Sequence, residues 1–440
     1  MEDHILNAIR QKLGDAIRTP FPPLVRREAE PALLQGKAQA VVGMRRAGKT
    51  FFLFQCLADR LAGGIERERL VYFNFEDERL GGLRSEELGT IIEEYYRQFP
   101  QFRNQAEVTW CLDEIQLVPG WERFVRRVLD SERAEVFVSG SSARMLSREV
   151  ATSMRGRAME VVITPFSFRE FLRGRNWLED APGRLASGAE RSALRAHFDA
   201  YLETGGFPEA RVFSVARDRV GLLQGYVDAV LFRDVAERHH ISNLPALRAF
   251  VRQLLRQPAA LLSVSKVYAD FASRGIAVSK ETLLGFLAHL EDAFLVFTLP
   301  LAGRSERQRQ VNPRKLYLAD HGLAQAFSPV PGLDRGRLIE NVVACELRRT
   351  SRDLAYARTA SGLEVDFVTT DFEGRRQLIQ AAADISSPAT FEREMRALTE
   401  ARLEFPDAAG LLVAEAEPPH GVTAPEGIQI VPVWEWLLTR

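Results

Sequence analysis

Short hydrophobic runs and longer amphipathic stretches alternate over the first third of the chain. The hydrophobic runs predict buried strands, at Ala40–Val42, Leu70–Phe75, Val108–Leu112, Val136–Ser139 and Val161–Ile163. The stretches between them predict helices, at Lys49–Leu61, Ser85–Phe99 and Trp121–Leu129. Strands that alternate with helices favour a mainly parallel sheet covered by helices on both faces. We therefore expect an α/β domain over residues 36–165, after an N-terminal helical segment over residues 1–35.

The pattern then changes to helices without strands. Residues 166–245 are expected to be helical throughout, with helices at Phe168–Arg173, Glu190–Glu203 and Val220–Arg238 and a break at Gly205–Pro208. Residues 246–325 give helix, helix, turn and helix, followed by strands at Phe294–Thr298 and Lys315–Leu318. Ser279 is a favourable N-cap for the last of these helices. This order of elements predicts a winged helix-turn-helix.

A second α/β region is expected over residues 333–440. Its strands are predicted at Leu354–Arg358, Leu363–Thr369, Gln377–Ala381, Gly410–Val413 and Ile428–Val431.

Length, composition and charge narrow the class of protein. At ~150 residues per domain, 440 residues suggest about three domains. Hydrophobic residues make up 46% of the chain and charged residues 27%, a balance typical of globular proteins and not of disordered ones. The 58 basic residues nearly equal the 59 acidic ones, so any contact with nucleic acid must come from a local patch.

The cysteines and the hydrophobic runs indicate the compartment. Three widely separated cysteines argue against a disulfide framework and favour a reducing environment. No apolar run approaches the ~18–20 residues that span a bilayer, and the N-terminus lacks a signal-peptide pattern. We expect a cytoplasmic protein without a membrane segment.

The segment Gly43–Thr50 matches the phosphate-binding pattern G-x-x-x-x-G-K-[ST]. It follows a predicted strand and opens a predicted helix, which is the context that makes the motif specific. Backbone N–H groups and the helix N-terminus would hold phosphates, Lys49 would reach the β- and γ-phosphates, and Thr50 would hold Mg²⁺. The predicted nucleotide-binding residues are Gly43, Arg46, Ala47, Gly48, Lys49, Thr50 and Phe51.

A second acidic motif follows the predicted strand Val108–Leu112. Asp113 and Glu114 at its end suit a Walker B site, in which Asp113 acts on Mg²⁺ and Glu114 polarises the attacking water. A carboxylate does this at neutral pH because its reference pKa of ~4.3 leaves it ionised. The predicted metal ligands are therefore Thr50 and Asp113.

Further motifs accompany these two along the chain. They are Leu-Asp-Glu-Ile-Gln at 112–116, Val-Ser-Gly-Ser-Ser at 138–142, Arg-Gly-Arg at 155–157 and Thr-Pro-Phe-Ser-Phe-Arg-Glu-Phe at 164–171. Together with the phosphate-binding loop, the set resembles prokaryotic AAA-superfamily ATPases of the archaeal and STAND-like types. Members of that family carry a C-terminal region similar to PD-(D/E)XK nucleases. The resemblance covers the chain from about Arg26 to its end.

The resemblance implies three further roles. Ser141 would be the sensor-1 hydroxyl near the γ-phosphate, and Arg155 or Arg157 would meet a γ-phosphate in the same chain or in a neighbour. Residues 166–245 would form a lid, with Pro208 packed against adenine. The alternatives are a Ser-rich turn, a surface salt bridge and a helix-breaking turn. The predicted catalytic residues are Lys49, Glu114, Ser141 and Arg157.

The predicted winged helix carries its positive charge outside its last helix. That helix is too apolar for a base-reading helix, since base readers present Arg, Lys, Asn or Gln. The 301–316 segment is basic, with Glu306 as its one acidic residue against Arg304, Arg307, Arg309, Arg314 and Lys315. A basic wing would contact DNA phosphates without reading sequence. The alternative is a solvated hairpin on an interdomain packing module.

The C-terminal region departs from an active nuclease. An active site of this type needs an Asp on one strand and an acid-x-Lys on the next. Asp366 is present, but Gln380 and Ala382 stand at the acid and lysine positions. We expect a degenerate domain that does not cleave nucleic acid.

These observations predict a cytoplasmic ATPase with ATP and Mg²⁺ as cofactors. A helical lid and winged helix would convey nucleotide state to the degenerate nuclease-like domain, acting on DNA. The alternative is a signalling switch that works through protein partners without nucleic acid. Oligomeric state is open, because an arginine finger between subunits needs a homo-oligomer, whereas a STAND-like switch rests as a monomer.

Overall fold

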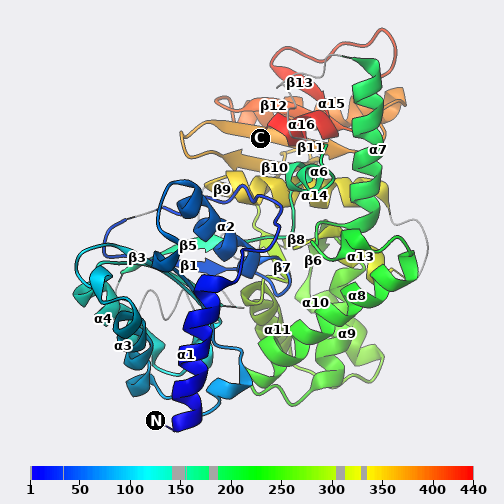
Figure 1. Cartoon of the computed structure of the whole chain (residues 1–440). Helices are drawn as coiled ribbons and strands as arrows, with labels where there is room; N and C mark the ends of the chain where they lie inside the picture. Colours follow the sequence, from blue (N-terminus) through cyan, green and yellow to red (C-terminus); the bar gives the residue numbers. More distant parts are fainter. Residues whose placement is uncertain are drawn as a thin grey trace. The chain divides into compact units, whose positions relative to one another are not determined.

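The computed structural model describes residues 2–32, 34–140, 154, 156–177, 187–303, 313–328 and 334–439. It divides into two compact units (Figure 1). Unit 1 comprises Met1–Thr164 and Asp292–Phe294, and unit 2 comprises Pro165–Glu291 and Leu295–Arg440. The N-terminal segment therefore belongs to the same unit as the predicted phosphate-binding domain.

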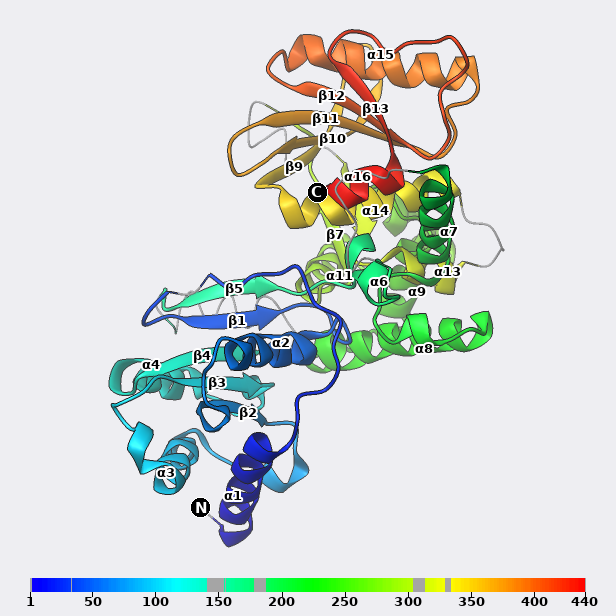
Figure 2. The same cartoon turned by 45° about the horizontal axis from the view of Figure 1, so that its top comes forward.

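Unit 1 contains the parallel sheet that the alternating pattern predicts. Its five strands lie in the order β2-β3-β4-β1-β5, and every neighbouring pair is parallel (Figure 2). Their bounds are Ala38–Val42 for β1, Leu70–Asn74 for β2, Val108–Asp113 for β3, Ala134–Ser139 for β4 and Ala158–Val162 for β5. Every residue of β1 and β3 is buried, because strands inside a covered parallel sheet have no solvated face.

In the described part of unit 1, four α-helices accompany this sheet: α1 (Asp3–Arg18), α2 (Lys49–Ala62), α3 (Gly89–Gln98) and α4 (Trp121–Ser131). Helix α2 packs on β2, β3 and β4, while α1 packs on β2 and α3. The expected helix over Ser85–Phe99 is wrong at its start. A short 3₁₀ turn occupies Ser85–Glu87, where the Glu87 carboxylate accepts a hydrogen bond from the Arg84 backbone N–H at 3.1 Å, and α3 begins only at Gly89.

The first part of unit 2 is mainly helical, as expected. Its elements are α6 (Phe168–Arg173), α7 (Gly188–Thr204), α8 (Ala216–Ala229), a π-helical segment (Val230–Glu237), α9 (Leu244–Leu255), α10 (Val264–Ser273), α11 (Lys280–Asp292) and α13 (His321–Phe327). The Ser279 hydroxyl accepts a hydrogen bond from the Thr282 backbone N–H at 3.1 Å, which confirms it as a capping residue.

A small antiparallel sheet accompanies these helices. Its strand order is β6-β8-β7, with β6 at Ala260–Leu262, β7 at Val296–Leu299 and β8 at Arg314–Leu318. The pattern of hydrophobic residues predicts β7 and β8 but misses β6, since a strand of three residues leaves no alternation to detect.

The second part of unit 2 is the predicted C-terminal α/β region. Its sheet has the order β13-β12-β11-β10-β9, antiparallel from β9 to β11 and parallel from β11 to β13. Helix α15 lies on one face of the sheet, while α14 and α16 lie on the other (Figure 2). The bounds are Arg335–Thr350 (α14), Asp353–Arg358 (β9), Glu364–Thr370 (β10), Arg376–Ala382 (β11), Pro388–Glu404 (α15), Ala409–Ala414 (β12), Ile428–Pro432 (β13) and Val433–Thr439 (α16).

Candidate functional site

The predicted phosphate-binding loop connects the end of β1 to the start of α2. Gly43, Arg46 and Gly48 all have positive φ, at 146°, 65° and 101°. A Cβ atom on Gly43 would lie 2.0 Å from the carbonyl oxygen of Ile163, so only glycine fits there. Positive φ at these positions is the kind of backbone conformation from which anion-binding sites of successive N–H groups are built.

Lys49 lies inside this loop at the first position of α2. Its side chain is buried, with the residue only 6% exposed, and Nζ donates hydrogen bonds to the carbonyl oxygens of Gly43 at 3.0 Å and Met44 at 3.2 Å. Phe51, two residues later, is 48% exposed. The structure therefore brings Lys49 to the loop as expected and leaves the Phe51 ring accessible beside it.

Asp113 receives three hydroxyl groups from three different elements. Thr50 Oγ1 donates to Asp113 Oδ2 at 2.8 Å, and Tyr72 OH donates to the same oxygen at 2.7 Å. Ser139 Oγ donates to Asp113 Oδ1. Asp113 is 1% exposed, so these contacts replace the water that it would otherwise bind. The predicted metal ligands Thr50 and Asp113 therefore do lie together.

The sequence predicts no role for Tyr72, and within the sensor-1 segment Ser139–Ser142 it favours the hydroxyl of Ser141 over that of Ser139. Tyr72 lies on β2 and Ser139 ends β4, the two strands that flank β3. Burial, and then the nearby Asp113 carboxylate, raise the pKa of the Tyr72 phenol far above its usual value, so Tyr72 is a hydrogen-bond donor at every physiological pH. Knowledge of the strand order would have identified both residues, because only the strands next to β3 present their side chains to Asp113.

Glu114 follows β3 in a left-handed backbone conformation, with φ at 56°. Its backbone N–H donates to Ser139 Oγ at 3.0 Å, and its carboxylate accepts a hydrogen bond from Gln116 Nε2. Burial raises the pKa of the Glu114 carboxyl, and the Lys49 charge opposes that shift. A positive φ at a residue with a side chain is strained backbone of the kind that functional sites retain.

Arg27, in the N-terminal segment, contacts the phosphate-binding loop and the helix that follows it. Arg27 and Gln55 exchange two hydrogen bonds, from the Arg27 N–H to Gln55 Oε1 at 2.6 Å and from Gln55 Nε2 to the Arg27 carbonyl at 3.1 Å. Arg27 Nη1 also donates to the carbonyl oxygen of Ala47 at 2.7 Å. The predicted nucleotide-binding residue Ala47 is thus held by a residue that precedes the predicted domain.

Arg157 is not brought to this site within its own chain. It immediately precedes β5, and its carbonyl accepts a hydrogen bond from the N–H of Ala38 at the start of β1. In a parallel sheet this places Arg157 at the edge opposite to the loop, which follows the end of β1. Its guanidinium instead bonds the exposed Asp130 carboxylate, the salt-bridge alternative that the sequence left open. Ser141 and Arg155 lie outside the described residues.

Pro208 lies in unit 2, in the turn that follows α7. Gly206 fixes this turn, since its N–H donates to Asp320 Oδ2 at 2.6 Å and its carbonyl accepts from the Phe166 N–H at 2.7 Å. The turn is thus a structured element of unit 2, and the contact of Pro208 with adenine stays a prediction.

The basic 301–316 segment lies largely outside the described residues, since residues 304–312 are not described. Lys315 is described, and its assignment to a DNA-contacting surface is wrong. The residue is 3% exposed, and its ammonium bonds three carboxylates. A buried, ion-paired lysine has no charge to offer a phosphate. Arg314 beside it is exposed.

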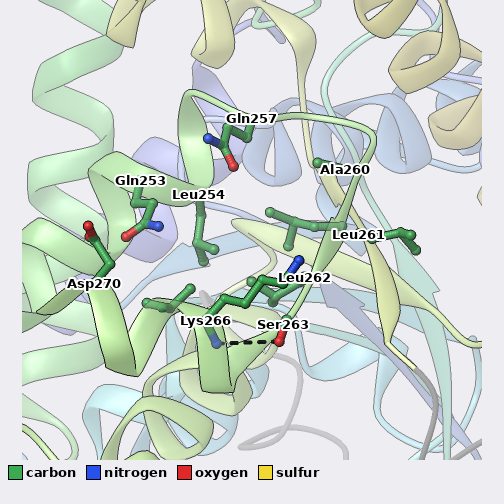
Figure 3. A pocket seen from close by; sticks show the side chains of 11 residues that line it. Gln253, Leu254, Gln257, Ala260, Leu261, Leu262, Ser263, Lys266 and Asp270 are labelled. Carbon is green, nitrogen blue, oxygen red and sulfur yellow. Dashed lines mark hydrogen bonds between the residues drawn. The ribbon is translucent and has the colours of Figure 1, made fainter. Parts of the chain in front are cut away.

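A cavity of about 290 Å³ lies elsewhere in unit 2, between α9, β6 and α10 (Figure 3). Leu254, Leu261 and Leu262 contribute its apolar wall, and Gln253, Gln257 and Asp270 its polar side chains. None of the site residues predicted from the sequence lines it.

The loop, the helix that follows it and the acidic end of β3 define a P-loop protein. Residues 35–172 match a family described as an AAA domain, so this P-loop domain is of the AAA type. Residues 195–334 match a domain of unknown function, DUF8612, which spans part of the predicted lid and all of the predicted winged helix.

Uncharacterized protein MJ1544 of Methanocaldococcus jannaschii is 31% identical over 426 residues, covering 94% of this chain and 91% of that protein. The chain belongs to the same family as that protein. An uncharacterized protein of Haemophilus influenzae is 28% identical over 331 residues, covering 75% of this chain and 78% of that protein.

A chain from the structure of Drosophila ORC bound to AT-rich DNA and Cdc6 is 12% identical. The match covers 73% of this chain and 92% of that chain at a TM-score of 0.21, too low to carry any inference. In the part of the chain that the structure describes, no helix combines the length and apolar character needed to cross a bilayer.

Proposed function

We propose that the AAA domain binds Mg²⁺-ATP and hydrolyses it. The observation that carries this proposal is the 2.8 Å hydrogen bond between Thr50 Oγ1 and Asp113 Oδ2. Thr50 directly follows the buried Lys49 in the sequence. Phosphate-binding loops of this type place Lys on the β- and γ-phosphates and hold Mg²⁺ with a hydroxyl and a Walker B carboxylate. Gly43, Arg46, Ala47 and Gly48 would supply the backbone cradle.

The residues present suit Mg²⁺ chemically. Thr50 and Asp113 offer a hydroxyl and a carboxylate oxygen, the hard ligands that this ion prefers. When bound, the ion would neutralise negative charge on the phosphates. Glu114, at the end of the same strand, would orient the attacking water and accept its proton. Ser139 would keep Asp113 and Glu114 in register through its two hydrogen bonds.

We further propose that nucleotide state is conveyed through a helical lid (166–245) and a winged helix (246–325) to a degenerate nuclease-like domain (333–440). The order of helices and strands in residues 244–318 and the mixed five-stranded sheet after residue 350 support these assignments. DNA would be contacted through Arg304, Arg307, Arg309 and Arg314. Because Lys315 is buried, only four of the five basic groups of the 301–316 segment are left to contact DNA. This favours the alternative, a switch that acts on protein partners.

The position of Arg157, the predicted arginine finger, bears on the oligomeric state. Because Arg157 precedes β5, at the edge away from the loop, a role at a γ-phosphate requires a neighbouring chain. We therefore propose a homo-oligomer in the ATP-bound state. Measuring the mass with ADP and with a non-hydrolysable ATP analogue, with and without DNA, would test it; a monomer under every condition would exclude the intermolecular role.

The ATPase proposal is tested with two variants. Lys49→Ala should abolish tight ATP binding, because it removes the charge that meets the phosphates. Glu114→Gln should retain ATP binding and lower turnover by ~10²–10⁴, the usual size of a general-base effect. Hydrolysis at the wild-type rate by Glu114→Gln would refute the assignment of the base.

A further inference from the structure

Strand β8 carries a lysine to a point where three carboxylates converge. Lys315 Nζ lies 2.7 Å from Glu340 Oε1, 2.8 Å from Glu364 Oε1 and 2.8 Å from Asp366 Oδ1. Glu340 comes from α14, and Glu364 and Asp366 from β10. Three elements of unit 2 that are separate in sequence therefore meet on a single ammonium group.

The surrounding hydrogen bonds hold two of these carboxylates in place. Tyr317 OH donates to Glu340 Oε1 at 2.7 Å, and the Ala381 N–H donates to Asp366 Oδ2 at 3.0 Å. Gln380, which stands at the acid position of the nuclease pattern, accepts a hydrogen bond from the Asp366 backbone N–H at 3.2 Å. Gln380 thus supports the backbone of β10 instead of contributing a charge.

The ionisation of the cluster is consistent with a fixed positive charge at its centre. Burial by itself would lower the pKa of Lys315, but the three carboxylates outweigh it and raise that pKa well above its usual value. Burial, and then Asp366, raise the pKa of Glu340 to about 8. The positive charge at the centre of the cluster is therefore that of Lys315, which its acidic neighbours hold in the ammonium form.

Oxygen ligands that converge from separate elements on one point are the arrangement of a divalent-cation site. Here the point is taken by a nitrogen of the chain itself. Among the residues that the structure describes, no group of three or more acidic, histidine or cysteine side chains is arranged so that it could hold a metal ion.

We propose that Lys315 is a built-in cation that takes the place of a divalent metal among Glu340, Glu364 and Asp366. The ammonium joins β8 to α14 and β10 permanently, without the dependence on concentration that a metal would bring. It also prevents Mg²⁺ from binding to the carboxylates. This is a second cause for the absence of nucleic-acid cleavage, in addition to the lack of an acid at position 380 and of a lysine at position 382. This inference deepens the non-cleaving role proposed above and does not depend on ATP turnover.

Binding of Mn²⁺, followed by electron paramagnetic resonance, tests the proposal on the full chain without nucleotide. Every sample carries Asp113→Asn, so that the predicted nucleotide site loses its carboxylate metal ligand. With Lys315 present, we expect no tightly bound Mn²⁺. Binding that appears with Lys315 in place and is lost on Asp366→Asn would overturn the proposal and make Lys315 a neighbour of a bound metal.

The converse experiment removes the ammonium. Lys315→Met leaves the buried acidic cluster without its compensating cation, so the unfolding midpoint should fall by about 10 °C. Mn²⁺ should then bind at one equivalent and restore much of that loss, and the added change Asp366→Asn should cancel the rescue. A folded Lys315→Met chain that ignores Mn²⁺ would also overturn the proposal.

If Lys315→Met does not fold, the chain that retains Lys315 decides the question alone. Absence of Asp366-dependent Mn²⁺ binding then supports the proposal and its presence overturns it. The ATPase proposal is decided separately by Glu114→Gln, so neither failure is mistaken for the other.

Discussion

Thr50 and Asp113 are 63 residues apart in sequence, and a hydrogen bond of 2.8 Å joins the hydroxyl of one to the carboxylate of the other. Thr50 is the second residue of α2, which follows the P-loop, whereas Asp113 ends β3, two places from β1 in the sheet. The parallel order brings both to one edge, because the loop follows the end of β1 and Asp113 the end of β3. The acidic pair at the end of β3, which is a weak signal alone, thus joins the phosphate-binding motif in one site through strand order.

The Asp113 contacts predict how Mg²⁺ dependence responds to mutation. Tyr72→Phe removes one donor to Asp113 Oδ2 and leaves the ring in place. Losing one such bond, at roughly 1.5 kcal/mol, should raise the Mg²⁺ concentration for half-maximal ATPase activity about tenfold. Activity at saturating Mg²⁺ should stay near that of the wild type.

The control for this experiment is Tyr95→Phe. The Tyr95 hydroxyl donates to the Glu68 carbonyl at 2.9 Å, away from Asp113, so its loss should leave Mg²⁺ dependence unchanged. Equal Mg²⁺ requirements for Tyr72→Phe and the wild type would show that the Tyr72 hydrogen bond does not position Asp113.

Gly43 predicts a steric limit on the P-loop. In Gly43→Ala the new Cβ would lie 2.0 Å from the Ile163 carbonyl oxygen, so the loop or the end of β5 must move. ATP affinity should fall at least tenfold, measured by calorimetric titration.

Gly36→Ala is the matched control for Gly43→Ala. Gly36 also has positive φ, at 75°, but open space around its Cβ position. It should cost about 1 kcal/mol of stability and leave ATP affinity intact. Equal ATP affinities for the two variants would show that the close approach to Ile163 does not shape the site.

The sequence predicts the parts of this site that depend on local pattern. The P-loop and the ends of β1, β3 and β10 are encoded within a few residues, so their positions are predicted to within about two residues. Tyr72 and Ser139 act only through neighbours in the sheet, and single-sequence patterns contain no strand order. Lys315 stands among basic residues in the sequence, which suggests a surface, but the strand β8 turns it inward toward carboxylates as far as 51 residues away.

The wing proposal predicts a sequence-independent loss of DNA binding. Changing Arg304, Arg307 and Arg309 together to Gln should weaken binding equally for unrelated sequences. It should also reduce the slope of log affinity against log salt by up to three phosphate contacts, each worth ~0.9 on duplex DNA. Binding is measured by fluorescence anisotropy at several salt concentrations.

A matched variant removes the same charge elsewhere in unit 2. Arg375, Arg393 and Arg396 are exposed arginines of the C-terminal region, and their joint change to Gln should leave both affinity and salt slope unaltered. If the two triple variants behave alike, net charge and not the wing governs DNA contact, and the protein-partner alternative gains.

The raised pKa of Glu340 predicts a pH dependence of stability. An acid whose pKa rises from 4.5 to about 8 on folding keeps a proton that the unfolded chain loses. The folded state therefore binds more protons between these values, and stability must fall as pH rises from about 4.5 to about 8. Glu340→Gln keeps an acceptor for Tyr317 and Lys315 but has no proton to lose, so its thermal midpoint should fall less over this window.

Glu392→Gln, which removes an exposed acid on α15, should follow the wild-type curve. If Glu340→Gln retains the full wild-type slope, another group in unit 2 carries the pH dependence and the Lys315 ammonium leaves Glu340 ionised.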